Sequence, residues 1–315
     1  MRKSARILIL SFFCLAVSAL GQQQQPDWNK VQIEIKKLTA NVYMLRFSNG
    51  TPANVSGNVG ALVGDDGTII VDDGYAPMAP KLEAALKTIS DKPVKYVFNT
   101  HWHGDHSAGN EYFGKFAVVI GHDNVWKMKE AGGKLFEPSP PSARPVITFS
   151  DQLTLHIDGG EIHAIHFPRG HTDTDSVIFF PQGEVVQMGD DFTVWDPPHF
   201  PAIDMDRDGS GGIQGQIAAA EYVLSHAPED VQIIPGHGPS ARRDDLVKYL
   251  AVLKGTGAAV QAGIDQGKSL DLLKQEKVLA KWDYLGQGKA SDDYLERVYR
   301  CLTQKPTSAK PAGAQ

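Results

Sequence analysis

The chain has 315 residues, of which 42% are hydrophobic and 22% are charged, and its formal net charge at pH 7 is −6. This length and composition suffice for one large core or two modest ones. The acidic balance disfavours a protein that binds nucleic acid, so we expect a small-molecule partner.

Residues 1–21 have the layout of a secretory signal peptide. Three basic residues precede an apolar run over residues 7–20, which is shorter than the roughly 20 residues that span a bilayer. We therefore expect an exported protein, periplasmic or secreted, with no stable membrane insertion; an uncleaved anchor is the alternative. Removal of this segment would take the net charge from −6 to −9 and would remove Cys14. Cys301 would then be alone and is expected to pack on a C-terminal helix.

Strand and helix patterns alternate from Val31 onward. Alternating apolar residues predict strands over residues 31–38, 41–47, 58–64 and 68–74. Helical spacing follows over residues 78–89, and residues 94–100 have the pattern of a buried strand. The later expected strands cover residues 117–122, 153–157, 161–167, 176–180, 184–188 and 231–238. Helices are expected over residues 122–132 and 215–225.

Two strand-rich halves that each carry outer helices predict an α+β fold, an αββα sandwich of two packed sheets between helices. We place this domain at residues 31–240, after a polar linker at residues 22–30. Amphipathic stretches within residues 241–303 predict C-terminal helices that pack on the sandwich. The tail at residues 304–315 is rich in Pro, Ala and Lys and is expected to be disordered.

A dense group of possible metal ligands follows the strand at residues 94–100. His101, His103, Asp105 and His106 fall within six residues, and Gly104 between them favours the tight turn that lets them converge. Three imidazoles and a carboxylate buried together without a metal would compete for hydrogen-bond partners. The motif therefore predicts a metal site.

Three more candidate ligands, His171, Asp190 and His237, lie in loops at the ends of later predicted strands. Each alone has an ordinary explanation as a capping or turn residue. Together with the first motif, in this order and spacing, they resemble the metallo-β-lactamase superfamily. The resemblance extends from about Val31 to Gly238, and all of that family's motifs are present.

The resemblance implies a two-metal site of the kind found in glyoxalase II-like hydrolases. One ion would be held by His101, His103 and His171. The other would be held by Asp105, His106 and His237, with Asp190 bridging the two. Imidazole and carboxylate are ligands that zinc prefers, although iron and manganese also accept them.

The resemblance also implies the chemistry and the supporting residues. Two zinc ions would share a bridging hydroxide that attacks a carbonyl, and Asp105 would orient this hydroxide and take its proton. Asp72 would orient the site without touching an ion, and Asp173 and Asp175 would fix the His171 loop by hydrogen bonds. The aromatic candidates for a wall of the substrate pocket are Trp102, Trp195 and His199.

The expected function is that of an exported zinc-dependent hydrolase acting on an amide, lactam, lactone or thioester. Recognised β-lactamases of this superfamily carry Cys or Ser in place of Asp190, so class B β-lactamase-like activity is only an alternative. Mixed charges on the C-terminal helices disfavour a glutathione thioester. A mononuclear iron enzyme resembling sulfur dioxygenases is a second alternative, and a binding protein without turnover is a third.

Residues 204–209 resemble the start of a calcium loop, with oxygen-bearing side chains at alternate positions. The twelfth position of that loop is Gly215, where calcium loops need a bidentate Glu. We therefore expect a flexible insertion beside the active site, with calcium binding as the alternative. The loops that would select the substrate cover residues 49–58 and 192–212, and the sequence leaves the substrate, the native metal and the oligomeric state open.

Overall fold

A computed structural model of the chain describes residues 27–50, 55–132, 138–205 and 210–304. The predicted signal peptide, most of the predicted linker, nearly all of the predicted tail and residues 206–209 of the possible calcium loop lie outside these ranges. Among the described residues, no helix combines the length and the apolar character that crossing a membrane requires.

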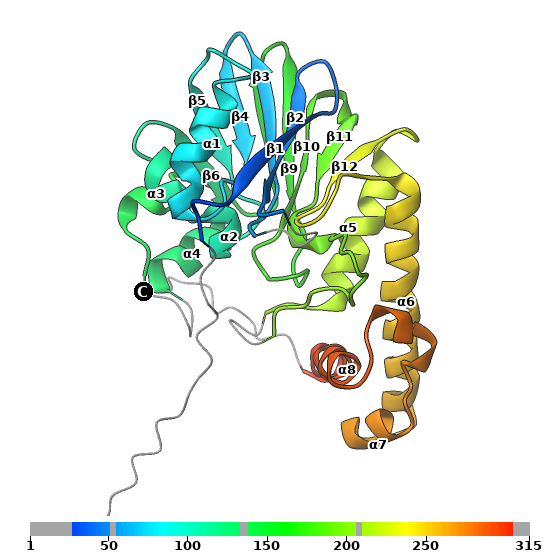
Figure 1. Cartoon of the computed structure of the whole chain (residues 1–315). Coiled ribbons are helices and arrows are strands. Elements are labelled where there is room, and N and C mark those ends of the chain that lie inside the picture. Colours follow the sequence, from blue (N-terminus) through cyan, green and yellow to red (C-terminus); the bar gives the residue numbers. More distant parts are fainter. Residues whose placement is uncertain (1–26, 51–54, 133–137, 206–209, 305–315) are drawn as a thin grey trace, which may run out of the picture.

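Two sheets face each other at the centre of the molecule (Figure 1). The first sheet follows chain order, with antiparallel pairing from β1 to β4 and parallel pairing from β4 to β7. Its strands are β1 (Gln32–Lys37), β2 (Val42–Ser48), β3 (Val59–Gly64), β4 (Gly67–Val71), β5 (Val94–Phe98), β6 (Val118–His122) and β7 (Ile147–Phe149).

The second sheet has the order β13-β12-β11-β10-β9-β8. Its pairs are antiparallel except for β11 and β12, which run parallel. Its strands are β8 (Gln152–Ile157), β9 (Gly160–His166), β10 (Ser176–Phe179), β11 (Val185–Gln187), β12 (Gln232–Ile234) and β13 (Ala241–Arg242).

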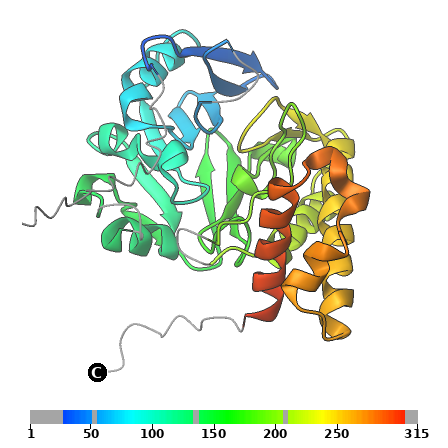
Figure 2. The ribbon, with the colours of Figure 1, turned by 60° about the horizontal axis from the view of Figure 1, so that its bottom comes forward.

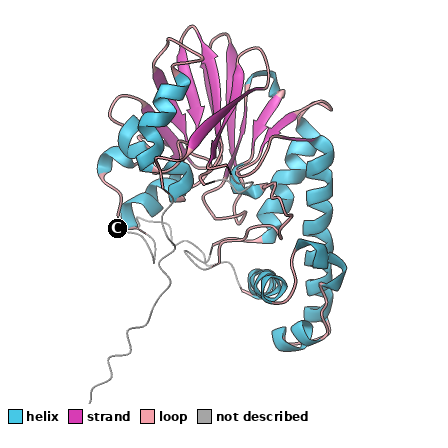
Figure 3. Cartoon of the chain, in the orientation of Figure 1, coloured by secondary structure: helices cyan, strands magenta, loops and turns pink. Residues whose placement is uncertain are grey.

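Helices flank the pair of sheets on both sides (Figure 3). The α-helices are α1 (Ala79–Leu86), α2 (Gly104–Ser107), α3 (Asn110–Phe113), α4 (Asp123–Ala131), α5 (Ile213–His226), α6 (Arg243–Asp265), α7 (Leu270–Gln275) and α8 (Lys289–Thr303). The 3₁₀ turns are η1 (Ala76–Met78), η2 (Pro141–Ala143), η3 (Pro181–Gly183), η4 (Gly189–Asp191) and η5 (Ala280–Leu285).

Three apolar layers hold the sandwich together. The central layer contains buried side chains of both sheets, among them Phe98 of the first and Ile178 of the second. An outer layer lies under α1, where Leu82 meets the first sheet, and another lies under α5, where Val223 meets the second. Burying a side chain of this size contributes about 1.5–3 kcal/mol. The order of helix, sheet, sheet and helix confirms the predicted αββα sandwich.

The C-terminal helices have an apolar core of their own. Helices α6, α7 and α8 lie side by side (Figure 2). Their buried side chains include Leu253, Leu273 and Leu295, and the loop before α5 adds Ile203 and Met205 to the same cluster. This loop therefore connects the C-terminal helices to the edge of the sandwich.

The structure differs from the sequence prediction mainly in short elements. Strands β7 and β13 were not predicted, because two or three residues are too few to show an alternating pattern. One of the amphipathic stretches within residues 241–303 covers residues 269–282, and the structure divides it into α7 and η5, with Lys277 at a positive φ of 52° between them. Cys301 is buried on α8, as expected. The domain boundaries stay a prediction.

Candidate metal centre

All seven candidate ligands lie in loops at one edge of the sandwich. The motif from His101 to His106 follows β5, and His171 lies between β9 and β10. Asp190 lies in η4, directly after β11, and His237 follows β12. Strands β5, β11 and β12 belong to the parallel parts of the two sheets, and ligands of open α/β sheets gather at the carboxyl ends of such strands.

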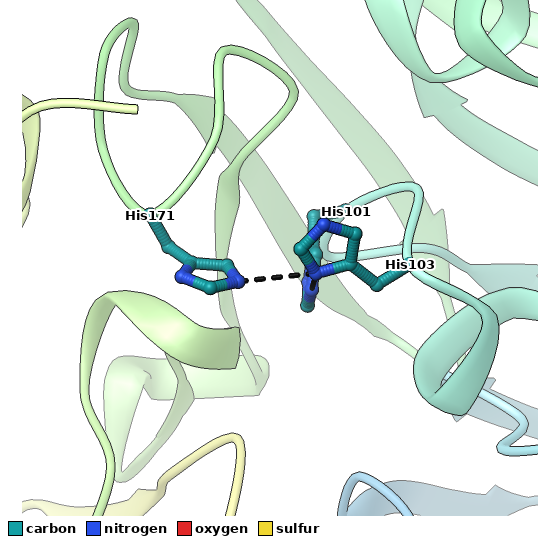
Figure 4. Close-up of side chains that lie close together, drawn as sticks. All are labelled: His101, His103 and His171. Carbon is teal, nitrogen blue, oxygen red and sulfur yellow. Dashed lines mark hydrogen bonds between the residues drawn. The ribbon is translucent and has the colours of Figure 1, made fainter. Parts of the chain in front are cut away.

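His101, His103 and His171 form the first cluster. The Nδ1 atom of His103 lies 3.1 Å from Nε2 of His101 and 3.1 Å from Nε2 of His171 (Figure 4). All three side chains are buried. Zinc–nitrogen bonds of about 2.0–2.1 Å in a tetrahedron place neighbouring donor atoms roughly 3.4 Å apart. The spacing of the three nitrogens therefore fits one metal ion.

Two of these rings have their proton position set by a partner on the far side. The Nδ1 of His171 donates to the carbonyl oxygen of Ala202 over 3.0 Å, and the Nε2 of His103 donates to Oδ2 of Asp204 over 2.7 Å. A neutral imidazole carries one N–H, so the other nitrogen of each ring keeps a lone pair. Both lone pairs point into the cluster.

The position of the proton on His101 is set by Thr100. The Thr100 hydroxyl lies 2.8 Å from Oδ2 of Asp72, to which it donates, and 3.1 Å from Nδ1 of His101. With its hydrogen used, the hydroxyl accepts the N–H of His101, whose Nε2 then keeps a lone pair. Burial and the neighbouring histidines hold the pKa of His101 well below its usual range. Three neutral imidazoles thus direct lone pairs at one point, which is the arrangement of a metal site and not of a hydrogen-bond network.

Asp105, His106 and His237 form the second cluster. The Nε2 atoms of His106 and His237 are 3.3 Å apart, and Oδ2 of Asp105 lies 3.2 Å from that of His237 and 3.7 Å from that of His106. The Nδ1 of His106 donates to Oδ2 of Asp72 over 2.8 Å. The second cluster can therefore also direct two nitrogens and one carboxylate oxygen at a common point.

Asp190 lies between the two clusters. Its Oδ1 is 3.3 Å from Nε2 of His106 and 3.4 Å from Nε2 of His237, whereas its Oδ2 is 3.5 Å from Nε2 of His171. The Oδ1 atom is buried and has no hydrogen-bond partner among the described residues. One carboxylate thus offers an oxygen to each side, as a bridging ligand would. The ligand roles of the seven residues stay a prediction.

The charges of this site balance one another. Burial lowers the pKa of His237, but the carboxylates of Asp190 and Asp105 more than offset this and raise it to about 9. Burial raises the pKa of Asp190, but His237, His106 and His171 more than offset this and hold it well below its usual range. Ionised carboxylates and protons on the histidines neutralise each other, and a cation can take the place of those protons.

Asp72 occupies the position that the sequence assigned to an orienting aspartate. It directly follows β4 at a positive φ of 62°, a conformation that costs free energy and is found at functional sites. It accepts hydrogen bonds from the Thr100 amide over 2.7 Å, from the Thr100 hydroxyl and from His106. Burial raises the pKa of Asp72, and His106 opposes this effect. Asp72 thus holds His101, through Thr100, and His106 in place, while its own carboxylate does not face the points where the ligand atoms converge.

Asp173 and Asp175 both accept hydrogen bonds from backbone amides of the loop around His171. Asp173 accepts from the amide of Arg169 over 3.1 Å, and Asp175 accepts from the amide of Thr172 over 2.6 Å. The sequence did not predict a role for Asp191, whose Oδ1 accepts from the amide of His171 over 2.8 Å. Its position beside Asp190 was the available signal.

The site requires glycine at positions 57 and 236, and not at position 104 as the sequence suggested. Gly104 lies in the first turn of α2 without a positive φ, and a Cβ there would meet Tyr75 at an ordinary 3.7 Å. The chain does turn tightly there, since the amide of His106 donates to the carbonyl oxygen of His103 over 3.1 Å, but the turn does not depend on the conformational freedom of glycine. A Cβ at Gly57 would lie 2.4 Å from the ring of His106, and a Cβ at Gly236 would lie 1.9 Å from Oδ1 of Asp190. These two glycines allow the ligands to approach the backbone.

The three aromatic candidates for the pocket wall lie in different surroundings. Trp102 is buried and packs against His103, with ring centroids 5.2 Å apart, so it supports the site from inside. The Trp195 ring stacks on His237 with centroids 4.9 Å apart, and His199 is exposed next to it. Trp195 and His199 also line a cleft of about 370 Å³ between their loop and α6.

Asp204 has a partner that the calcium-loop pattern did not suggest. It is buried, and its carboxylate accepts a hydrogen bond from His103. No sequence motif marks this contact, because the two residues are 101 positions apart. The carboxylate of Asp204, the first position of the possible calcium loop, is therefore directed to His103.

The model of the metallo-beta-lactamase superfamily matches residues 53–248, which include all seven candidate ligands. The chain belongs to the metallo-β-lactamase superfamily. Within it, a metallo-beta-lactamase from Pontibacter korlensis is similar in structure, with a TM-score of 0.59, 20% identity and coverage of 71% of this chain and 99% of the other. At that identity the likeness shows the fold alone.

Curated members of the superfamily match shorter parts of the chain. A hydroxyacylglutathione hydrolase from Brucella anthropi is 29% identical over 136 residues, which are 43% of this chain and 47% of that protein. An atrochrysone carboxyl ACP thioesterase from Claviceps purpurea is 26% identical over 124 residues, 39% of this chain and 35% of that protein. The matches thus span less than half the length of these relatives.

Proposed function

We propose that this member of the metallo-β-lactamase superfamily is a hydrolase that holds two divalent ions, with zinc as the native metal, and cleaves a carbonyl substrate. The substrate classes are an amide, a lactam, a lactone or a thioester. The observation that carries the proposal is the position of Asp190, whose two carboxylate oxygens face two separate clusters of ligand atoms.

The donor set supports zinc as the metal. Imidazoles and carboxylates make up the two clusters and Asp190 between them, and the nitrogens of the first cluster lie at distances that fit tetrahedral coordination. When bound, the two ions supply a water of lowered pKa and polarise the carbonyl of the substrate.

Asp105 is the residue that we assign to proton transfer. Its side chain is 22% exposed, whereas those of His106, Asp190 and His237 are 0–9% exposed, so it lies on the solvent side of the second cluster. Burial raises the pKa of Asp105, but the charges on His106 and His237 more than offset this and keep it below the usual range. An ionised carboxylate at this place can orient the attacking water and accept its proton.

Two observations indicate which substrate classes should be tested first. The names of two relatives indicate thioester substrates for those proteins, so acyl thioesters are the first probes for this chain. We propose that β-lactams are not its main substrates, because Asp190 stands where recognised β-lactamases of the superfamily carry Cys or Ser. Penicillins and carbapenems should be cleaved with a kcat/KM well below the roughly 10⁴ M⁻¹s⁻¹ that is typical of enzymes.

Metal analysis combined with a hydrolase screen tests the proposal. Protein purified without chelator should contain near two equivalents of zinc and should hydrolyse at least one of acyl thioesters, lactones and amides. Removal of the metal by a chelator should abolish the activity, and added zinc should restore it. A single iron without zinc would contradict the proposal and would favour the sulfur dioxygenase-like alternative.

We also propose that the chain is exported, on the basis of the basic and apolar pattern of residues 1–21. Expression of the full chain in a bacterium, followed by fractionation and N-terminal sequencing, tests this. A mature protein that begins near Gln22 in the periplasm or medium is expected, and an intact N-terminus in the cytoplasm would contradict the proposal.

A further inference from the structure

The segment from Ala202 to Met205 contacts the first ligand cluster at two points. The carbonyl oxygen of Ala202 accepts from Nδ1 of His171 over 3.0 Å, and Oδ2 of Asp204 accepts from Nε2 of His103 over 2.7 Å. The amide of Asp204 also donates to the carbonyl oxygen of His171 over 2.8 Å. One short segment therefore contacts two of the three histidines.

The contact between Asp204 and His103 has the features of a strong hydrogen bond. It is short and buried at both ends, and its acceptor is a carboxylate, which makes it a charge-assisted bond. Such a partner fixes the ring orientation and the tautomer of a ligand histidine and raises the basicity of its other nitrogen. Here that other nitrogen is Nδ1, which faces His101 and His171.

The C-terminal helices hold this segment in place. Ile203 and Met205, which alternate with Ala202 and Asp204, are buried in the apolar cluster of α6, α7 and α8. The amide of Gly211 donates to the carbonyl oxygen of Asp204 over 3.0 Å. A Cβ at Gly211 would lie 2.5 Å from the carbonyl oxygen of His171, so a larger residue would push the two segments apart.

A second contact joins the same parts of the molecule. The guanidinium of Arg169, two residues before His171, donates to the carbonyl oxygen of Cys301 on α8 over 2.7 Å. The loop that carries His171 is thus bonded directly to the C-terminal helices, in addition to its contacts with Ala202 and Asp204.

We propose that Asp204 is a positioning residue for the metal held by His101, His103 and His171, and that the C-terminal helices set its position. This inference rests on the proposed two-metal function. Asp204 acts through His103, by holding Nε2–H on the far side of the ring and directing the lone pair of Nδ1 toward the metal. The segment Ala202–Met205 and the C-terminal helices then help to position the metal ligands, in addition to covering the sandwich.

The variant Asp204→Asn tests the proposal in the full chain. It keeps the size and one acceptor oxygen but removes the charge. Zinc titration by calorimetry should show one of two binding steps weakened by about 10–100-fold, and this should be the step that His103→Ala loses. The other step should keep its affinity. Asp196→Asn, which removes an exposed carboxylate from the same loop, serves as the matched control and should leave both steps unchanged.

Two results would overturn the proposal. One is an unchanged affinity of both steps in Asp204→Asn. The other is an equal loss at both steps together with a lower melting temperature of the metal-free variant, because this pattern belongs to a residue that only holds the loop. Wild-type protein that binds fewer than two zinc ions would instead contradict the proposed function.

Nitrogen NMR of the wild-type protein decides the inference even where a variant does not fold. In the metal-free protein, His103 should be the Nε2–H tautomer, with its proton shifted by the carboxylate, whereas His101 and His171 should be Nδ1–H tautomers. A His103 ring with its proton on Nδ1 would exclude the positioning role of Asp204, whatever the metal content.

Discussion

The two ligand clusters are supported by different parts of the molecule. The second cluster depends on Asp72, which lies at the end of β4 inside the sandwich and accepts from His106. The first cluster depends on Ala202 and Asp204, which lie in a loop that packs on the C-terminal helices. Asp72 also reaches His101 of the first cluster through Thr100, so the end of β4 supports both clusters. The comparison indicates that the first cluster depends in addition on the segment Ala202–Met205, which holds His103 and His171.

Asp190→Asn should have the largest effect, because it weakens the link between the clusters. Asn keeps the size but loses the charge that faces His106, His237 and His171. Activity should fall by at least about 10²-fold, since loss of even an outer partner of a metal ligand costs 10–100-fold. The second metal should loosen more than the first, because three neutral imidazoles still hold the first.

Calorimetric zinc titration and circular dichroism check this expectation. The fold should survive, because Asp190 lies outside the apolar layers. A variant that binds two zinc ions with unchanged affinities and turns over normally would exclude Asp190 as a bridging ligand.

Asp72→Asn should have the next largest effect and tests the support inside the sandwich. Asn accepts through one oxygen and places an NH₂ group opposite the donors of Thr100 and His106. An unsatisfied buried donor costs about 1–3 kcal/mol, so the free energy of unfolding of the metal-free protein should fall by about that amount. The backbone is not the cause, since Asn tolerates a positive φ well.

Asp73→Asn is the matched control for Asp72→Asn. Asp73 is equally buried, but neither of its oxygens has a hydrogen-bond partner among the described residues. Burial raises its pKa well above the usual range, and the charge of Lys129 opposes this effect. Asn has nearly the same shape, so the loss of stability should be smaller than at Asp72, where three hydrogen bonds are disturbed. Urea unfolding should separate the two variants. Equal losses of stability would show that burial, and not the hydrogen bonds of Asp72, decides the result.

The same contrast explains what the sequence could and could not predict. Asp72 follows a strand with a clear apolar pattern and matches a motif of the superfamily, so its place was predictable. Asp204 lies in an irregular loop, and its partner His103 is 101 residues away. Only packing brings them together, because the segment is held by side chains of helices that come later in the chain. The acidic pattern around Asp204 therefore indicated only a flexible insertion, with a calcium loop as the alternative, and gave no sign of the contact with His103.

A smaller effect is expected from the His122 and His166 rings, which stack between β6 and β9 with centroids 3.5 Å apart. Burial and the neighbouring His166 lower the pKa of His122 to about 4, and burial also lowers that of His166. A histidine in the unfolded chain has a pKa of about 6.5, so between pH 6.5 and 4 the unfolded state binds more protons. Stability should therefore fall as the pH falls through this window, with His122 contributing about 2 kcal/mol.

His122→Asn isolates this contribution. Asn is a good N-cap and can replace the ring nitrogen that accepts from the amide of Asn124 at the start of α4. The variant should lose less stability than the wild type between pH 6.5 and 4 in urea unfolding. Parallel curves for the two proteins would contradict the assignment. This stack supports the His171 loop from the sandwich side, since His166 donates to the carbonyl oxygen of Asp175.

The smallest effect is expected from Trp195, and it concerns how His237 is held. The Nδ1 atom of His237 is buried without a hydrogen-bond partner among the described residues. In contrast, the ring nitrogens of His103, His171 and His106 that face away from the ligand clusters donate to Asp204, Ala202 and Asp72, respectively. The stacked Trp195 ring is therefore its main orienting contact. Such aromatic pairs contribute about 0.5–1.5 kcal/mol.

Trp195→Ala should accordingly weaken the second zinc-binding step by about 2–12-fold, which is the same free energy expressed as a binding ratio. The first step should keep its affinity, because His101, His103 and His171 do not stack on Trp195. Trp195→Phe should keep most of the zinc affinity that Trp195→Ala loses. His199→Ala, which removes an exposed neighbour of Trp195, should leave the affinity of both steps unchanged. If Trp195→Ala weakened the first step instead, Trp195 would not act through His237, and its assignment to the second cluster would have to be withdrawn.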